Sequence, residues 1–518
     1  MSVASVLRSR WAVWISAVVL PPLGLFLLWK RRSIALGPKL AASALILLWM
    51  PLGLWTAARA ARVLGIPVER DGSGRMPMLS VRPGESHYRL LEENRKQQRA
   101  QPVESAAAVP LPAPAAAAKP EPSKPTPPPA PKGSAYWTDF RGPGRDGHYR
   151  QGPILTEWPE IGLKILWQQP VGGGYASFVI AHGKAFTIEQ RRNREVAAAY
   201  DTETGRELWT NAWDGAFNES MGGPGPRATP TWHEGKLYVL GAEGELRCLD
   251  ADTGKVVWRK NILEDNGAKN LGWAMSASPL VVDDKLITLP GGRTGNSVVA
   301  YHKLSGEPVW KSLSDQAAYV SPALVTVAGR RQVIVVTADR MVGIEPGDGH
   351  LLWEFPWKTQ YDVNSAQPLV VADNRVFISS GYGHGAAVVE LQPEGDKLAV
   401  KQVWSNTRMK NKFTSSVVHE GHIYGLDESI LACLDARTGD LKWKGGRYGF
   451  GQLVLASGHL IVTTEAGEIV LVKATPEKHL ELATFPAVSG KTWNHPAIAD
   501  GKLFVRNTTE MACFRIAP

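Results

Sequence analysis

One short phrase, repeated down the C-terminal three-quarters of the chain, limits what this protein can fold into. Its clearest copy reads LDADTGKVVW and places Asp250, Gly254 and Trp258 at four-residue steps. Further copies occur at Asp201, Gly205 and Trp209; at Asp435, Gly439 and Trp443; and, more loosely, at His302, Gly306 and Trp310 and at Glu345, Gly349 and Trp353. A unit that returns every forty to fifty residues or so is typical of a stacked or closed array of identical supersecondary pieces.

The residues around this phrase follow a common pattern of four short strands. A first strand follows a Ser/Thr-Pro pair, as in ATPTW at 228–232, and a Gly turn leads to a second, as in GKLYVLG at 235–241. A third strand ends at the Asp of the phrase, and a fourth carries the Trp. Four short antiparallel strands joined by tight turns form one propeller blade. Asp and Gly suit the turn, and the Trp is the apolar plate that packs one blade on the next.

Counting these units predicts an all-β fold, an eight-bladed β-propeller of four-stranded antiparallel blades over residues 136–518. Seven complete units cover 177–213, 228–262, 277–313, 320–357, 366–406, 413–447 and 451–486. The last stretch, 492–516, holds three strands, and its fourth is predicted at 163–169, because Trp167 precedes Trp209 by the ordinary repeat spacing. Such closure removes the open edge of the sheet. The tryptophans expected between blades are Trp167, Trp209, Trp258, Trp310, Trp353, Trp404 and Trp443.

Two apolar runs, at about 11–29 and 40–57, predict a transmembrane helical hairpin over residues 1–64, because each approaches the ~20 residues that cross a bilayer. A cleaved signal peptide is the alternative for the first run, but no Ala-x-Ala-like site follows it. The loop KRRSIALGPK between the runs holds four positive charges, which places it in the cytoplasm by the positive-inside rule. The predicted location is therefore the inner (cytoplasmic) membrane, with the C-terminal domain in the periplasm.

Residues 65–135 are predicted to form a juxtamembrane segment followed by a stalk. The stretch 85–100 is charged and helix-permissive without a wide apolar stripe, which favours a solvated helix. Residues 102–132 contain eleven Pro and nine Ala, a composition that cannot bury a core. We expect this linker to be disordered, to extend as polyproline II and to hold the propeller at a distance from the membrane.

The net charge of +9 does not describe a nucleic-acid surface. The repeat region 136–518 holds 40 basic and 42 acidic residues, so the basic excess belongs to the N-terminal segments. The cysteines Cys248, Cys433 and Cys513 make no CxxC pattern and occupy one equivalent position in three repeats, which favours a packing role. The twelve His residues show no HExxH spacing, so no metal site is predicted.

The units resemble the PQQ-type propeller repeat, which is shared by quinoprotein dehydrogenases and the outer-membrane assembly lipoprotein BamB. The phrases WTDFRGPGRDG (137–147), GPGPRATPTW (223–232), WAMSASPLVV (273–282) and LPGGRTGNSVVAYHKLSGEPVW (289–310) look like those of PQQ-binding-like β-propeller repeat proteins. The resemblance covers 136–518 and implies the propeller fold. It leaves the function open, because this repeat occurs in enzymes and in non-catalytic scaffolds.

The two functions that the resemblance implies differ in what they require. Quinoprotein dehydrogenases bind PQQ with Ca²⁺ and stack a vicinal disulfide on the quinone, and this chain has no adjacent Cys pair and no haem motif. We therefore assign no catalytic residue and expect no cofactor, unless the chain is a PQQ-dependent dehydrogenase. The similarity to BamB is one of domain, because no lipobox Cys is present.

Residues just before each first strand are expected at one mouth of the propeller's central channel. Aromatic and charged side chains that converge there define a candidate ligand-binding site. The set is Tyr175, Arg227, Trp273, Tyr319, Asp362, Asn364, Lys412, Tyr448, Trp493 and His495. An anionic, planar ligand would suit Arg227 and Lys412 for charge and Trp273 or Trp493 for stacking. The alternative is that these residues only close the mouth.

Taken together, the sequence favours a membrane-anchored periplasmic propeller that acts as a non-catalytic scaffold for an envelope protein partner. The expected partners are an envelope protein and the inner membrane, which the chain would contact through the hairpin. No nucleic-acid partner is expected. The alternative is a PQQ-dependent oxidoreductase of the alcohol or sugar dehydrogenase type that delivers electrons to the membrane. A polysaccharide- or surface-binding module is a third class of function.

Overall fold

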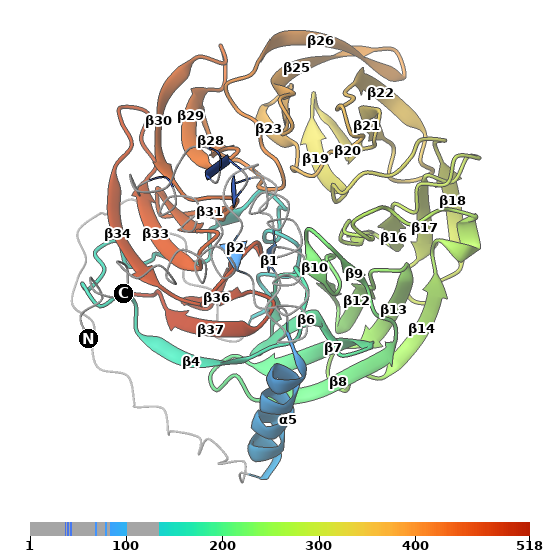
Figure 1. The fold of residues 1–518 in the computed structure, drawn as a ribbon. Helices are drawn as coiled ribbons and strands as arrows, with labels where there is room; N and C mark the ends of the chain where they lie inside the picture. The colour runs from blue at the N-terminus through green and yellow to red at the C-terminus, as the bar shows by residue number, and fades with distance from the viewer. Residues whose placement is uncertain are drawn as a thin grey trace, which may run out of the picture. The chain divides into compact units, whose positions relative to one another are not determined.

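A computed structural model describes residues 83–100 and 134–518, together with a few residues that precede them (Figure 1). Those few are 29, 37, 39–40, 42–43, 68–69 and 78–79. The chain divides into two compact units, Met1–Gly84 and Glu85–Pro518.

In the first unit, strand β1 (Val68–Glu69) pairs antiparallel with β2 (Met78–Leu79). The Trp29 indole N–H donates to Ser43 Oγ at 3.0 Å, which joins the end of the first predicted membrane helix to the start of the second. Most of the predicted hairpin, with helices at 11–29 and 40–57, lies outside the described residues. In the part of the chain that the structure describes, no helix is long and apolar enough to cross a membrane.

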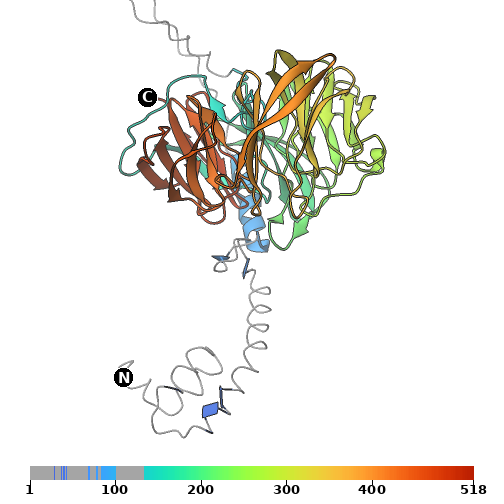
Figure 2. The same ribbon diagram turned by 90° about the horizontal axis from the view of Figure 1, so that it is seen from above.

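The second unit is an eight-bladed propeller, seen along its axis in Figure 1 and from the side in Figure 2, and the predicted fold is confirmed. Successive strands of a blade pair antiparallel. The strands of blades one to four are β5 (Val179–Ala181), β6 (Lys184–Arg191), β7 (Arg194–Asp201) and β8 (Glu207–Asp214); β11 (Thr231–His233), β12 (Lys236–Leu240), β13 (Glu245–Asp250) and β14 (Val256–Asn261); β15 (Leu280–Val282), β16 (Lys285–Thr288), β17 (Val298–His302) and β18 (Pro308–Ser312); and β19 (Ala323–Val327), β20 (Arg330–Val336), β21 (Arg340–Ile344) and β22 (Leu351–Pro356).

Blades five to eight repeat this order, and blade seven carries an extra inner strand, β3 (His148–Tyr149), parallel to β31. Their strands are β23 (Leu369–Ala372), β24 (Arg375–Ser380), β25 (Gly385–Glu394) and β26 (Lys397–Asn406); β27 (Val417–His419), β28 (His422–Asp427), β29 (Ile430–Asp435) and β30 (Leu441–Arg447); β31 (Gln452–Ala456), β32 (His459–Thr463), β33 (Glu468–Lys473) and β34 (Glu481–Pro486); and β35 (Ala497–Ala499), β36 (Lys502–Arg506), β37 (Glu510–Arg515) and β4 (Ile165–Pro170). The first strands lie innermost, in contact from β5 round to β31 and from β35 back to β5.

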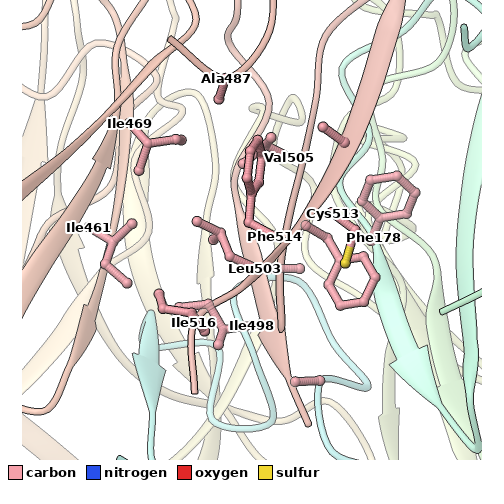
Figure 3. Close-up of a cluster of buried hydrophobic side chains, with 14 of the residues drawn as sticks. Phe178, Ile461, Ile469, Ala487, Ile498, Leu503, Val505, Cys513, Phe514 and Ile516 are labelled. Carbon is pink, nitrogen blue, oxygen red and sulfur yellow. The ribbon is translucent and has the colours of Figure 1, made fainter. Parts of the chain in front are cut away.

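The ring closes in blade eight, where β4 pairs antiparallel with β37 and Trp167 lies opposite Cys513. The predicted closing strand is therefore confirmed. Behind it, buried side chains of blades seven, eight and one form a continuous apolar cluster (Figure 3), which includes Phe178, Phe514 and Ile461. Burial of such side chains is the main favourable term in holding neighbouring blades together.

The repeated phrase forms a joint between blades. The Trp258 ring lies over Gly306 of the next blade, where an added Cβ would come within 2.8 Å of the ring, and its indole N–H donates to Lys303 O at 3.0 Å. Equivalent bonds to the next blade's turn are made by Trp167, Trp209, Trp310, Trp404 and Trp443. Gly is required because the turn has positive φ, 75° at Gly306, and because the ring occupies the space of a side chain.

Trp353 is the exception among these tryptophans. Its indole N–H donates to the Gln332 side chain of its own blade, and the ring lies against Gly343. The next blade lacks the Asp-Gly turn and instead extends β25 and β26 into a long hairpin, with β26 in contact with β22. Trp353 is nevertheless buried, within an apolar cluster that spans blades four and five.

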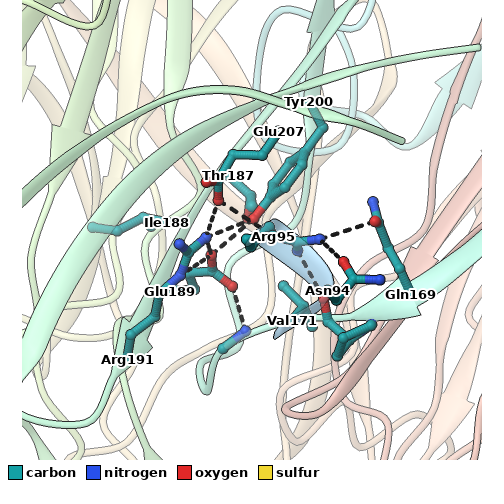
Figure 4. A network of polar contacts seen from close by, with 12 residues as sticks. Asn94, Arg95, Gln169, Val171, Thr187, Ile188, Glu189, Arg191, Tyr200 and Glu207 are labelled. Carbon is teal, nitrogen blue, oxygen red and sulfur yellow. Dashed lines mark hydrogen bonds and ion pairs between the residues drawn. The ribbon is translucent and has the colours of Figure 1, made fainter. Parts of the chain in front are cut away.

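Helix α5 (Glu85–Ala100) packs against the propeller, so the expectation that this helix is solvated is wrong. Tyr88, Leu91 and Arg95 are buried at positions i, i+3 and i+7, which form one helix face. Arg95 carries that contact (Figure 4): it donates to Gln169 Oε1 at 2.9 Å and to Pro170 O at 2.8 Å, and pairs with Glu207 at 3.3 Å. This buried helix face was not predicted from the sequence because its third member, Arg95, is a charged residue with an apolar stem.

The position of α5 changes the geometry available to the Pro/Ala-rich segment. That segment lies outside the described residues, but α5 before it and Ser134 after it belong to one compact unit, Glu85–Pro518. Residues 101–133 therefore connect two points of the same unit. The chain between the predicted membrane helices and this unit is the stretch 58–84.

Candidate functional site

The candidate site lies at the end of the propeller where the inner strands begin. Tyr175 precedes β5 and Trp493 precedes β35, so both lie at this end of the ring. A small hairpin of β9 (Asn218–Glu219) and β10 (Gly223–Pro224) precedes β11 and holds Arg227. Arg227 Nη2 donates to Gly223 O at 2.8 Å and pairs with Glu219 at 3.5 Å.

An arc of aromatic rings crosses this end of the molecule. The Tyr175 and Trp493 rings lie 5.3 Å apart, Trp493 and Phe413 4.7 Å, and Phe413 and Phe450 5.3 Å between centroids. These residues come from loops before the first strands of blades one, eight, six and seven. The structure thus brings two predicted site residues, Tyr175 and Trp493, together with two phenylalanines that the sequence analysis did not select.

Three cations lie over rings at the same end. Lys491 Nζ is 4.3 Å from the Trp493 ring centroid, Lys412 Nζ is 4.4 Å from that of Phe450, and the Arg227 guanidinium is 4.7 Å from that of Phe217. Such contacts hold a positive charge close to an apolar face. We call the following residues the mouth cluster: Tyr175, Phe217, Arg227, Tyr382, Lys412, Phe413, Phe450, Lys491 and Trp493.

Burial shifts the pKa of two groups of the mouth cluster, Arg227 and Tyr382. Burial lowers the pKa of Arg227 from its ordinary value, although the carboxylate of Glu219 acts in the opposite direction. Burial also raises the pKa of Tyr382 to about 12. At neutral pH the phenol therefore stays uncharged. Glu219 in turn accepts backbone N–H bonds from Met221, at 2.7 Å, and Gly223, at 3.0 Å.

The remaining predicted residues of blades three to five divide into two groups. Trp273 and Tyr319 form a second aromatic pair with centroids 5.6 Å apart. Asp362 lies half exposed at φ 57° and pairs with Lys358 at 3.6 Å. Asn364 is buried, with its amide donating to Thr337 O at 2.9 Å and accepting from Ser380 Oγ at 2.7 Å. Through these bonds the Asn364 side chain holds its loop against blades four and five.

His495 and Tyr448 also lie away from the mouth cluster. His495 is buried, packs edge-on against Phe140 with centroids 4.9 Å apart, and has its pKa well below the ordinary value because of burial and the nearby charge of Arg141. The Tyr448 hydroxyl donates to Glu481 at 2.8 Å, within the packing of blades six and seven.

The central channel is filled by residues of the chain's own N-terminal side. Trp137 is fully buried, and its carbonyl accepts from Ile180 N at 2.8 Å. Thr138 O accepts from Trp232 N at 2.9 Å, and Gly147 O from Leu455 N at 2.8 Å. These partners lie on inner strands of blades one, two and seven. We call residues 134–152 the channel plug.

The channel plug was not predicted from the sequence. Its phrase WTDFRGPGRDG served there only to carry a family resemblance. One sequence signal was available: glycines at 142, 144 and 147 flank the two arginines of the phrase, which indicates a loop with unusual backbone. In the structure Arg141 and Arg145 both adopt positive φ, 65° and 52°. Such backbone is uncommon outside Gly and marks a segment whose conformation is held by its surroundings.

The cysteines do not supply the stacked disulfide that the resemblance to quinoprotein dehydrogenases implied. The thiols of Cys248, Cys433 and Cys513 are free and buried in three different blades, so no pair of them can cap a planar cofactor. Burial raises the pKa of Cys248 and Cys433 to about 12. Across residues 83–100 and 134–518, no group of three or more His, Cys, Asp or Glu side chains is placed to hold a metal ion.

The repeat, the eight blades and the closing strand define a PQQ-like β-propeller. Comparison with known families adds to this. The family model of the outer membrane protein assembly factor BamB matches residues 192–445. BamB from Yersinia pestis is 21% identical over 283 residues, which cover 51% of this chain and 68% of that protein. The chain thus carries a propeller similar to that of BamB.

A quinoprotein and a solved structure complete the comparison. Quinohemoprotein alcohol dehydrogenase from Comamonas testosteroni is 34% identical over 130 residues, but these cover 23% of this chain and only 17% of that enzyme. The crystal structure of BamB from Moraxella catarrhalis superposes with a TM-score of 0.50 at 14% identity, over 68% of this chain and 99% of that one. This structural similarity supports the propeller fold of the chain.

Proposed function

We propose that this chain is a membrane-anchored scaffold of the cell envelope whose propeller binds a protein partner through the mouth cluster. The observation that carries this proposal is the interleaving of aromatic rings with Arg227, Lys412 and Lys491 on one face, where Phe413 and Trp493 are partly exposed. Aromatic and Arg side chains are the residue types that dominate binding energy at protein interfaces. The similarity to BamB, an assembly factor by description, supports a binding role.

The channel plug supports a surface mode of binding. Because residues 134–152 bond to the inner strands, they occupy the channel between those strands, so a partner would bind across the mouth rather than through the channel. A partner segment that lies across this face would set acidic groups against the three cations and apolar groups against Phe413 and Trp493. Extended segments commonly bind loop-rich faces in this way.

The N-terminal sequence supports a location for the scaffold. We propose an inner-membrane anchor at residues 1–64, with the propeller in the periplasm. The two apolar runs and the four positive charges of the loop between them support this topology.

Site-specific photo-crosslinking in membranes tests the binding face. A photoreactive residue at Tyr361, which is 60% exposed and 5.5 Å from the Tyr382 ring, should capture one discrete partner, whereas the same residue at Val257, 46% exposed on an outer strand, should not. Lys412→Ala should reduce the crosslink about tenfold through loss of a charge contact, and Lys311→Ala on the outer strand β18 should leave it unchanged. Equal capture from 361 and 257 would exclude the mouth cluster as the binding face.

The second candidate is a PQQ-dependent oxidoreductase, and one observation favours it: Trp493 with Lys491 and Arg227 could stack and neutralise an anionic planar ligand. Calorimetric titration of PQQ with and without Ca²⁺ into the purified protein separates the two candidates. Micromolar binding lost in Lys491→Ala would support the oxidoreductase. The scaffold proposal expects no binding heat, with crosslinking from position 361 intact.

A further inference from the structure

Two buried arginines in the channel plug differ in how their charge is compensated. Arg145 pairs with Asp139 at 3.0 Å and donates to Ser278 O at 3.2 Å and Pro322 O at 2.8 Å. It also donates to Thr231 and to Pro279 O. Its guanidinium thus has a carboxylate and a full set of acceptors, as a buried cation requires.

Arg141 is equally buried, at 1% exposure, yet only one of its nitrogens has partners. Nη2 donates to Ser416 O at 2.7 Å and to Asp146 O at 3.3 Å. Nε and Nη1 have no acceptor, and no carboxylate lies within ion-pair distance of this guanidinium among the residues that the structure describes. The nearby Asp146 carboxylate is bound by Arg150 at 2.7 Å. An isolated buried cation of this kind costs several kcal/mol.

A second group with an unused donor lies close to Arg141. His148 Nδ1 is 2.8 Å from Arg150 Nη2, and since a guanidinium can only donate, this Nδ1 accepts and the proton of the neutral ring sits on Nε2. That Nε2 is buried without an acceptor. Burial, together with the charges of Arg150 and Arg141, lowers the pKa of His148 to about 4, against the opposing effect of Asp146. His148 therefore offers a neutral N–H donor at physiological pH.

We propose that Arg141 binds a small monovalent inorganic anion of the halide class inside the central channel, with His148 as a second donor. The anion supplies the negative charge that Asp139 supplies to Arg145, and Nε and Nη1 of Arg141 donate to it. The burial of Arg141 limits the size of the anion. On the Nη2 side the guanidinium is already enclosed, because a Cβ at Gly147 would collide with it. A carboxylate side chain of a partner cannot reach a residue that is 1% exposed.

Halide-dependent stability of the full-length protein tests this site. At constant ionic strength, replacing gluconate by 150 mM chloride should raise Tm by about 2 °C with saturation, as expected for a ligand that binds only the folded state. Arg141→Met should abolish the chloride dependence. Arg506→Met is the matched control, because Arg506 is as buried but donates to Thr187, Ile188 O and Gly172 O of the protein itself, and it should keep the dependence.

A crystal of the wild-type protein soaked in bromide makes the test independent of any variant. An anomalous peak beside Arg141 Nε and Nη1, together with the chloride-dependent Tm, is the expected result. A peak without a Tm effect at 150 mM chloride would indicate binding at crystal concentration only and would overturn the proposal. Water density at Arg141 with equal Tm in both salts would overturn it as well.

Discussion

At the scale of single residues, the repeated phrase is a contact between a tryptophan and the glycine of the next blade. The sequence spacing predicted the tryptophan as a plate between blades and the glycine as a turn residue, and the structure shows that the two meet in most copies, with Trp353 as the exception. The mouth cluster was predicted in part: Tyr175, Arg227, Lys412 and Trp493 precede inner strands, as the blade count required. Phe450 and Lys491 were not selected, because nothing in their spacing separates them from other loop residues.

The contact between the Trp258 ring and Gly306 predicts how much stability is lost when position 306 carries a side chain. Gly306→Ala should lower the free energy of unfolding by about 2 kcal/mol more than Gly329→Ala, measured by urea denaturation. Both glycines have positive φ, 75° and 70°, but an added Cβ meets the Trp258 ring at Gly306 and nothing within 4 Å at Gly329. Equal losses for the two variants would mean that the ring contributes nothing beyond backbone strain.

A buried carboxylate predicts sensitivity to acid. Burial alone would raise the pKa of Glu189, but the charges of Arg191, Arg506 and Arg95 lower it from 4.5 to about 2. Since the folded pKa lies below the unfolded one, ionised Glu189 stabilises the fold above pH 4.5, and this contribution is lost as the pH falls toward 2.

Glu189→Gln should therefore flatten the fall in stability between pH 5 and pH 2 by on the order of 2 kcal/mol, measured by urea denaturation at several pH values. Glu243→Gln, on an exposed loop, should leave the profile unchanged. If both variants kept the wild-type profile, groups other than Glu189 would cause the loss of stability at acid pH.

At the scale of elements, strands were predictable and the non-repeating pieces were not. The closing strand β4 was found because Trp167 keeps the repeat spacing. The channel plug and α5 have no repeat to reveal them. The carbonyl groups of the plug accept from backbone N–H groups scattered over blades one, two and seven. Helix α5 buries only Tyr88, Leu91 and Arg95, so neither piece leaves a periodic apolar pattern.

Neighbouring leucines of α5 give a matched test of its packing. Leu91→Ala should weaken packing of the helix by about 2–3 kcal/mol, because this side chain is 1% exposed, whereas Leu90→Ala, at 55% exposure, should have little effect. Hydrogen exchange of residues 85–100 reports the result directly. Faster exchange in both variants, or in neither, would contradict the observed helix face.

At the scale of the whole molecule, α5 determines which segment spaces the propeller from the proposed anchor. An insertion of twelve Gly/Ser residues after Gly72 should increase the membrane-to-propeller distance by roughly 20 Å. The same insertion after Ala108 should not, because residues 101–133 join two points of one unit. Energy transfer from a dye at the exposed Asp252 to a lipid acceptor measures both. An equal increase from the two insertions would show that α5 detaches in the membrane.

Blade eight unites β4 with β35, β36 and β37, which come from the far end of the repeat region. During synthesis, β4 emerges early and stays an unpaired edge until these last three strands arrive. Unpaired edges invite proteolysis and aggregation. A chain interrupted before residue 497 therefore leaves its ring open and its edges exposed. The last three strands are therefore the condition for a ring without exposed edges.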